Sequence, residues 1–322
     1  MSALIRVLFL LVVLAWPGAL TAQDFTNRSI RFVVPFPAGG PSDTISRVMA
    51  EKMSAIIGQT IVIENRVGAG GMTGIASVAK SAPDGYTVAI APPSQLAMNP
   101  HLRDSMPFNP LKDFALITQI VSVPEILVVH PSVPAQTLAE LVALAKQQPG
   151  QIAFASTGPG GMPHMAVELL MLTAGIKLVH VPYTGAAPAV NDLIGGHVKL
   201  MFADVPVLIG NIQSGKLRAL AIGSRARIPQ LPSLATTAEL GMPQVEADNW
   251  YGLVAPAETP APVLAKLQSA AAAALKSPEV KDKLAAQGAY TVGNSSAEFA
   301  AYVKREFERW GKVIKATGIK IN

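Results

Sequence analysis

Short apolar runs alternate with amphipathic segments along most of the chain. The β-branched run Ile30 to Val34 predicts a strand. Apolar positions then recur at helical spacing from Ile45 to Ile57, until Gly58 ends the pattern. Ser42, behind Pro41, is predicted to cap this helix. Further strands are predicted at residues 60–63 and 86–90.

The second half of the chain repeats this alternation without repeating the sequence. Strands are predicted at residues 126–130, 152–155, 178–181, 200–203 and 217–222, with helices between them. Three helical patterns follow, at residues 261–275, 278–287 and 296–317. Strand–helix–strand order predicts an α/β protein of two lobes, each a mostly parallel sheet flanked by helices, with a cleft between them.

The domain boundaries follow from where the terminal helices have to pack. If they return to the first lobe, domain 1 comprises residues 23–123 and 250–322, and domain 2 comprises residues 124–249. The chain then crosses between the lobes near Ser122 and again near Trp250.

The first 22 residues have the features of an export signal. Arg6 precedes an apolar run from Val7 to Trp16, and small residues end the segment before Gln23. The alternative is a membrane anchor, but the run is short for a bilayer span. We therefore predict a cleaved signal peptide and a periplasmic protein. The absence of cysteine from the 322 residues is compatible with that compartment.

Composition and motifs argue against most enzyme classes. Without cysteine there is no thiol nucleophile or thiolate metal site, and the five histidines show no metal-ligand spacing. Neither a G-x-S-x-G elbow nor a phosphate-binding Gly-Lys-Ser/Thr is present. The glycine-rich segment Gly68 to Gly74 lacks the acid that would bind a ribose. The net charge of +5 comes without a dense basic stripe, so nucleic acid is not expected as a partner. We predict no cofactor and no metal.

Two loops that lead from a strand into a helix are the candidate binding elements. The first, Phe36 to Asp43, exposes small residues at a helix start, where free N–H groups and the helix dipole suit a carboxylate or phosphate. The alternative is an ordinary turn whose glycines supply special φ values. The second loop, Ser156 to His164, has the same layout, which favours the anion site. Loops at Tyr183 to Gly185 and at Asp204 are expected at the same rim.

Three polar side chains in these loops have a second interpretation. Asp43 and Asp204 could cap their own helices, and capping is the favoured role for both. His164 could donate to a ligand, but a solvated histidine at a helix end is the favoured interpretation.

Several motifs resemble one family throughout the mature chain up to Trp250. They include Pro35 to Asp43, Val62 to Arg66 with Gly68 to Gly71, Ala82 to Thr87, Ser156-Thr157-Gly158, Val181 to Gly185, Leu193 to Gly196 and Trp250-Tyr251-Gly252. They are similar to the Bug receptors, the periplasmic solute-binding proteins of tripartite tricarboxylate transporters. The C-terminal helices match this family only in pattern.

The resemblance implies a Venus flytrap fold that closes on a small organic acid. It implies a monomer that meets membrane transporter subunits, and loops that grip the carboxylates through backbone amides, with Asp204 near the pocket. The acid could be a di- or tricarboxylate, an acidic amino acid or an aromatic carboxylate. The expected ligand-binding residues are Phe36, Ala38, Gly39, Gly40, Ser42, Asp43, Ser94, Ser156, Thr157, Gly158, Gly160, Gly161, His164, Tyr183, Thr184, Gly185 and Asp204. A sensor for a signalling partner shares the fold and stays an alternative, as does, less favoured, an exported α/β enzyme.

Overall fold

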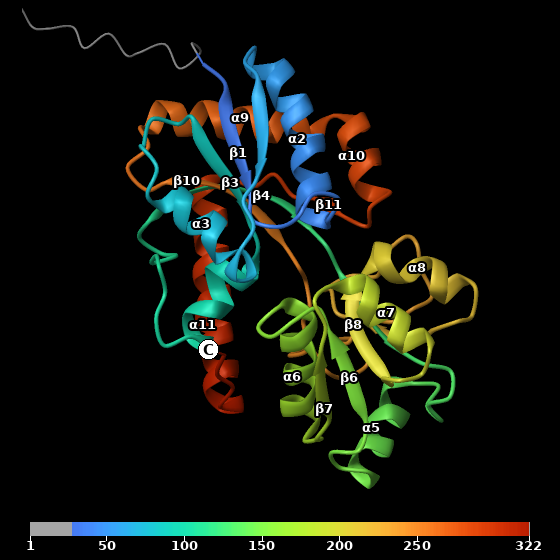
Figure 1. The fold of residues 1–322 in the computed structure, drawn as a ribbon. Helices are drawn as coiled ribbons and strands as arrows, with labels where there is room; N and C mark the ends of the chain where they lie inside the picture. Colours follow the sequence, from blue (N-terminus) through green and yellow to red (C-terminus); the bar gives the residue numbers. More distant parts are fainter. Residues whose placement is uncertain (1–27, 322) are drawn as a thin grey trace, which may run out of the picture.

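The computed structural model describes residues 28–321, so the predicted signal peptide lies outside the described residues. The chain forms two lobes, and each lobe is built on one sheet (Figure 1). The first sheet contains β1 (Ile30–Val34), β2 (Ile61–Asn65), β3 (Thr87–Ala91), β4 (Phe114–Ser122), β10 (Tyr251–Pro256) and β11 (Tyr290–Thr291), in the order β11-β4-β10-β3-β1-β2.

Alternate residues of β1 face two different helix layers. Phe32 of β1 lies in a core with α2 (Pro41–Ile57), α9 (Ala261–Lys276) and α10 (Pro278–Ala285). Its neighbour Val33 lies in the core on the other face, with α3 (Met72–Ala79) and α11 (Ser296–Thr317). Both residues are buried, as expected for a strand covered on both sides. Three short helical segments, η1 (Ala69–Gly71), η2 (Ser94–Met98) and α4 (Asn99–Leu102), follow β2 and β3.

The second sheet is also covered on both faces. It contains β5 (Glu125–Val129), β6 (Ala153–Ser156), β7 (Val179–Pro182), β8 (Leu200–Asp204) and β9 (Arg218–Ile222), in the order β7-β6-β8-β5-β9. One face packs on α5 (Leu138–Gln147) and α6 (Met162–Ala174), and the other on α7 (Ala186–Ile194) and α8 (Val205–Gln213). Helix α5 begins after Thr137, whose side chain accepts the Glu140 N–H.

The sheets are mixed, so the expectation of mostly parallel sheets needs correction. Strands β2, β1 and β3 pair in parallel, as do β7, β6 and β8. However, β10 runs antiparallel to both β3 and β4, and β5 runs antiparallel to both β8 and β9. The reason is the chain path. Both β5 and β10 enter their sheet from a crossover and insert into its interior, so they run away from the hinge while their neighbours run toward it.

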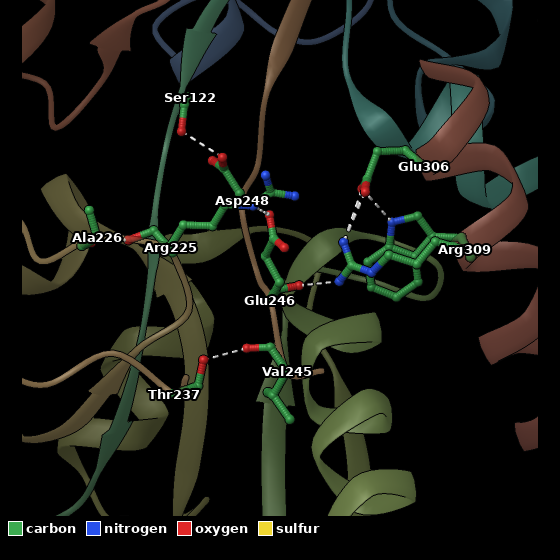
Figure 2. Close-up of polar contacts among 11 residues, drawn as sticks. Ser122, Arg225, Ala226, Thr237, Val245, Glu246, Asp248, Glu306 and Arg309 are labelled. Carbon is green, nitrogen blue, oxygen red and sulfur yellow. Dashed lines mark hydrogen bonds and ion pairs between the residues drawn. The ribbon is translucent and has the colours of Figure 1, made fainter. Parts of the chain in front are cut away.

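The two crossovers between the sheets lie side by side and are bonded to each other. Glu125 N–H donates to Ala247 O at 3.2 Å, and Asn249 N–H donates to Val123 O at 3.0 Å. The Ser122 hydroxyl donates to Asp248 Oδ2 at 2.6 Å (Figure 2). These bonds make the crossovers one two-stranded hinge instead of two independent linkers.

Helix α11 braces this hinge from the first lobe. Arg309 donates to the Glu246 carbonyl and also binds the Glu306 carboxylate, while Arg225 of the second lobe binds the Glu246 side chain (Figure 2).

Within residues 28–321 no helix has the length and apolar character needed to cross a membrane.

Candidate functional site

Helix α2 begins with backbone groups that no described side chain caps. Its N-cap is Gly40, with φ −79° and ψ 171°, and Pro41 occupies the first helical turn. The prediction that Ser42 caps the helix is therefore wrong. Proline is favoured at the first helical position, which moves the N-cap back to residue 40. The left-handed conformation belongs to Gly39, with φ +83°, and not to Gly40.

The carboxylate of Asp43 holds this loop in place. It accepts the Gly39 N–H at 2.9 Å and the Asn65 amide at 2.8 Å, and it binds Arg47 at 2.8 Å. The bond from Arg47 is the main cause that lowers the pKa of buried Asp43 to about 2. These partners occupy both carboxylate oxygens, so Asp43 orders the loop from its inner side. Ala38 and Gly39, on the outer side of the loop, are exposed.

The second predicted loop repeats this construction at the start of α6. Gly161 is the N-cap, with φ −79° and ψ 165°, again without a side-chain cap, and the preceding Gly160 has φ +74°. Gly160 N–H donates to His164 Nδ1 at 3.1 Å. The same relation thus appears twice: a left-handed glycine donates to the side chain four residues later, across a glycine N-cap.

His164 is buried, so its interpretation as a solvated helix-end residue is wrong. It is 4% exposed, its Nε2 lies 3.3 Å from Glu168 Oε1, and its ring stacks on His180 with centroids 3.9 Å apart. His180 is bonded through Nε2 to Ser156 Oγ at 2.6 Å. Burial, with the nearby His164, lowers the pKa of His180 to about 4, so a neutral ring holds Ser156 at neutral pH.

Ser156 connects this ring stack to the loop itself. Its hydroxyl accepts the Gly158 N–H at 3.2 Å, and its carbonyl accepts the Tyr183 N–H at 3.0 Å. The loops after β6 and β7 are therefore neighbours at the carboxyl ends of parallel strands, where ligands of α/β proteins bind. Thr157, in the same loop, is half-buried.

The loop after β7 leads into a third uncapped helix start. Gly185 is the N-cap of α7, and no described side chain caps it. The Tyr183 hydroxyl donates to Asp192 Oδ2 at 2.7 Å, and burial together with this bond raises the pKa of Tyr183 to about 12. The Tyr183 hydroxyl is therefore hydrogen-bonded to a residue of α7, whereas Thr184 is exposed in the loop.

Asp204 takes the N-cap position of α8, but its side chain does not cap the helix. The capping role favoured for Asp204 from the sequence is therefore wrong. The carboxylate instead faces Asn249, whose amide lies 3.4 Å from both oxygens and also donates to the Tyr251 hydroxyl at 3.3 Å. Tyr251 is in turn hydrogen-bonded with Ser42 of α2. A continuous polar chain therefore joins the α2 start in the first lobe to Asp204 in the second. Burial raises the pKa of Asp204 to about 7.

Ser94 and Phe36 lie beside the glycine-rich turn of the first lobe. The Ser94 hydroxyl donates to Gln95 Oε1 at 2.8 Å, and the Gln95 amide donates to Gly70 O at 2.6 Å. A Cβ on Gly71 would lie 2.7 Å from Gln95 and 3.1 Å from the Phe36 ring, so glycine is required there. The turn is thus packed against Phe36 and Gln95, which explains its glycines without a dinucleotide.

The lobes touch on both sides of these loops. A Cβ on Gly160 would lie 2.9 Å from Leu102 of α4, and one on Gly288 would lie 2.8 Å from Val205 at the start of α8. Two surface hollows lie elsewhere: one of about 500 Å³ between the end of α8 and β9, beside Arg218, and one of about 340 Å³ beside Arg31 at the start of β1. Neither contains a predicted site residue. Among residues 28–321 no cluster of His, Asp or Glu is arranged to hold a metal ion.

Sequence reasoning missed the polar groups at the hinge and the ring beside Ser156. Glu125, Asp248 and Asn249 lie at the crossovers, and His180 lies within β7. The available signal was Glu125, an acid at the start of the apolar run 125–129. A strand in a sheet that is covered on both faces rarely contains a charged residue.

Comparison with known proteins identifies the relatives of this chain. Residues 45–319 match the family described as the tripartite tricarboxylate transporter family receptor. Protein BugT of Bordetella pertussis is 36% identical over 323 residues, which cover 100% of this chain and 99% of that protein.

Solved structures with the same fold include two that hold organic acids. A protein from R. palustris solved with adipate has a TM-score of 0.83 and 35% identity, covering 92% of this chain and 99% of that one. MatC from Rhodopseudomonas palustris, solved with malate, has a TM-score of 0.79 and 30% identity, covering 89% and 99%. These relatives are solute-binding receptors and not enzymes, and they confirm the fold class.

Proposed function

Because the chain belongs to the receptor family of the tripartite tricarboxylate transporters, we propose that it captures a small carboxylate between its two lobes and delivers it to membrane transporter subunits. The observation that carries this proposal is the pair of helix starts at Gly40 and Gly161. Each follows the carboxyl end of a parallel strand, and neither is capped by a described side chain.

The physical basis is the supply of free N–H groups at these helix starts. The first N–H groups of a helix have no partner within it, and the helix dipole places partial positive charge there. Such a site binds an anion through groups that are already ordered, without the desolvation cost of a buried lysine or arginine. The bonds of Gly39 to Asp43 and of Gly160 to His164 keep the two turns ordered before a ligand arrives.

The favoured ligand class is a dicarboxylate. One helix start from each lobe suits an acid with two ends, and relatives of this chain hold adipate and malate. In this proposal the amides at Ser42 and Asp43 bind one carboxylate, and those at Met162 and His164 bind the other. Tricarboxylates and acidic amino acids present the same group and are the nearest competitors.

Export and domain division complete the proposal. Members of the family are periplasmic, and residues 1–22 are proposed to be the signal that directs this chain there. The strand membership of the two sheets supports division into residues 23–123 with 250–322 and residues 124–249. Uptake of the bound acid by cells that carry the transporter membrane subunits, lost when this receptor is deleted, is the test of the transport role.

A thermal-shift screen tests ligand binding directly. The mature chain is melted with malate, adipate, citrate, glutamate and benzoate at matched pH and ionic strength. A ligand present at a hundred times its Kd stabilises the folded state by about 2.7 kcal/mol. A dicarboxylate that raises Tm in a saturable way supports the proposal. If no acid raises Tm while an uncharged compound does, the proposed site chemistry is wrong.

A further inference from the structure

The carboxyl group of Glu125, the first residue of β5, is buried without a hydrogen-bond partner among the described residues. Its side chain is 0% exposed, and neither carboxylate oxygen has a hydrogen-bond partner among the described residues. An ionised carboxylate in such a place is very unfavourable, and a group in this position normally takes up a proton. Glu125 is therefore protonated in this arrangement of the lobes.

Two more carboxyl groups meet Glu125 at the hinge. Asp204 is its direct partner across the antiparallel β5–β8 ladder, so the two side chains lie on the same face. Asp248 lies on the return crossover, paired with Pro124. One Asp248 oxygen accepts from Ser122, and the other is buried without a partner among the described residues (Figure 2). Three acids from three separate segments thus converge where the lobes join.

Among the described residues no salt bridge joins this cluster to a cation. Arg225 binds Glu246, and Arg309 binds Glu306, so these two cations are engaged by other acids (Figure 2). The other titratable groups that face the cluster among the described residues are the carboxylates of Glu246 and Glu306, which add to the raised pKa of Asp248, and the hydroxyls of Tyr251 in β10 and Tyr302 in α11.

The pKa values of all three carboxyl groups are raised. Burial raises the pKa of Glu125 well above its usual range, with Asp204 and Asp248 adding to the effect. Burial also raises the pKa of Asp204 to about 7 and that of Asp248 to about 6.

We propose that Glu125, Asp204 and Asp248 form a proton-sensitive hinge, in which the closed arrangement of the lobes retains protons and opening releases them. Opening would draw Tyr251 and the α2 start away from Asp204 and admit water to the acids. This inference rests on the proposed closure of the lobes around a ligand, but its test requires no ligand.

The sign of the effect is fixed by the direction of the shifts. Below about pH 4 the acids are protonated in both the open and the closed form, so protons favour neither. Above that value the acids of the open form have lost protons, and the protein has to bind these protons again in order to close. The closed population therefore falls as pH rises from about 4 through 7, by up to tenfold per pH unit for each proton taken up.

The chain is suited to a two-label distance measurement because it contains no cysteine. Ile56→Cys on α2 and Leu172→Cys on α6 place spin labels at exposed positions of the two lobes. The distance distribution of the ligand-free protein is recorded from pH 5 to pH 8.5. We expect the short-distance population to decrease severalfold across this range.

The Glu125→Gln variant isolates the cluster. Glutamine has the shape of the protonated acid and cannot ionise, so we expect the pH dependence to weaken by the share of one proton and more of the closed form to remain at pH 8.5 than in the wild type. Glu258→Gln, at an exposed acid, is the matched control and should retain the wild-type profile. Should Glu125→Gln fail to fold, Asp248→Asn takes its place with the same expectation.

Two results would overturn the inference. One is a wild-type distance distribution that does not change between pH 5 and pH 8.5, which decides the matter without any variant. The other is an identical pH profile in the wild-type protein and in a folded Glu125→Gln variant. Neither result bears on whether the protein binds a carboxylate, because no ligand is present.

Discussion

Gly39 donates its backbone N–H to the carboxylate of Asp43 at 2.9 Å, across the N-cap of α2. Gly160 makes the same contact with His164 at 3.1 Å, across the N-cap of α6. The two lobes therefore present the same device at corresponding places: a left-handed glycine, a glycine N-cap and an anchoring side chain in the first turn. The side chains hold the turn from its inner side, and in the proposed site the first amides of the helix bind the anion.

A bulky residue at the first N-cap should weaken ligand binding more than folding. Gly40 has a negative φ, and a Cβ there would make only an ordinary 3.5 Å contact with Pro37 O. Gly40→Val should therefore fold, but its side chain would enter the proposed anion site. Loss of one charge-assisted hydrogen bond costs about 1.5–3 kcal/mol, or roughly tenfold to a hundredfold in Kd. Calorimetric titration and thermal melting are compared on the same variant.

Gly39→Val is the matched control for this prediction. Its φ of +83° disfavours a β-branched side chain, so stability should fall while Gly40→Val keeps its Tm. If Gly40→Val instead unfolds and its folded fraction binds with unchanged affinity, the loop is a structural turn and not a binding site.

Removal of the Asp43 charge should lower stability in a pH-dependent way. Asp43→Asn loses the ion pair with Arg47 and weakens the bond to Gly39, at an expected cost of about 1–2 kcal/mol at pH 7. Because the folded-state pKa of Asp43 is lowered from 3.8 to about 2, its stabilisation is complete above pH 4 and is lost as the pH falls toward 2. Melting from pH 7 to pH 2.5 should show the two proteins converging, whereas a constant difference would contradict this account.

His180 should act on binding through Ser156. His180→Phe keeps a ring beside Phe154 and His164 but loses the bond to Ser156 Oγ. We expect a twofold to tenfold increase in Kd, the range of about 0.5–1.5 kcal/mol for a neutral hydrogen bond.

The same variant has a stability signature. The folded-state pKa of His180 is lowered from 6.5 to about 4, so wild-type stability falls as the pH drops from 6.5 toward 4. The variant cannot take up that proton and should lose less stability over this interval. An unchanged Kd with an unchanged pH profile would mean that His180 has no part in ordering the loop.

The packing of α11 on the first sheet gives a prediction independent of the site. A Cβ on Gly252 would lie 2.1 Å from the Phe299 ring, so Gly252→Ala forces a buried aromatic residue to move. Overpacking of this kind costs about 1–3 kcal/mol. Gly210→Ala in α8, where no atom lies within 4 Å of the added carbon, should stabilise by about 0.5–1 kcal/mol. Urea unfolding of both variants checks the difference.

Local pattern predicted most of the strands and helices to within a few residues, because their signals are local. The strand at residues 30–34, the stop at Gly58 and the helix at residues 296–317 all follow from hydrophobic period and end residues. Strand β4 was missed because its apolar run is interrupted by Thr118 and Gln119. Both are buried, and the Thr118 hydroxyl and Gln119 N–H are bonded to Asn294, far along the chain.

The hinge acids were beyond local reasoning for a similar reason. Glu125 and Asp204 become neighbours only through the β5–β8 register, and Asp248 reaches them only when the chain returns. Sequence predicted the two glycine loops but placed the N-cap at Ser42, two residues after the observed N-cap Gly40, because Pro41 fits both assignments. His164 was misjudged because its burial depends on stacking with His180 of another strand.

Chemical-shift mapping of the backbone amides tests the central claim most directly. Isotope-labelled protein is titrated with malate and with adipate, and the amide resonances are followed. The account predicts that the largest shifts occur at Ser42 and Asp43 of α2 and at Met162 and His164 of α6, and that Gly40→Val abolishes them at the same ligand concentration. Saturable binding whose shifts instead centre on the hollow beside Arg218, with both helix starts unchanged, would contradict it.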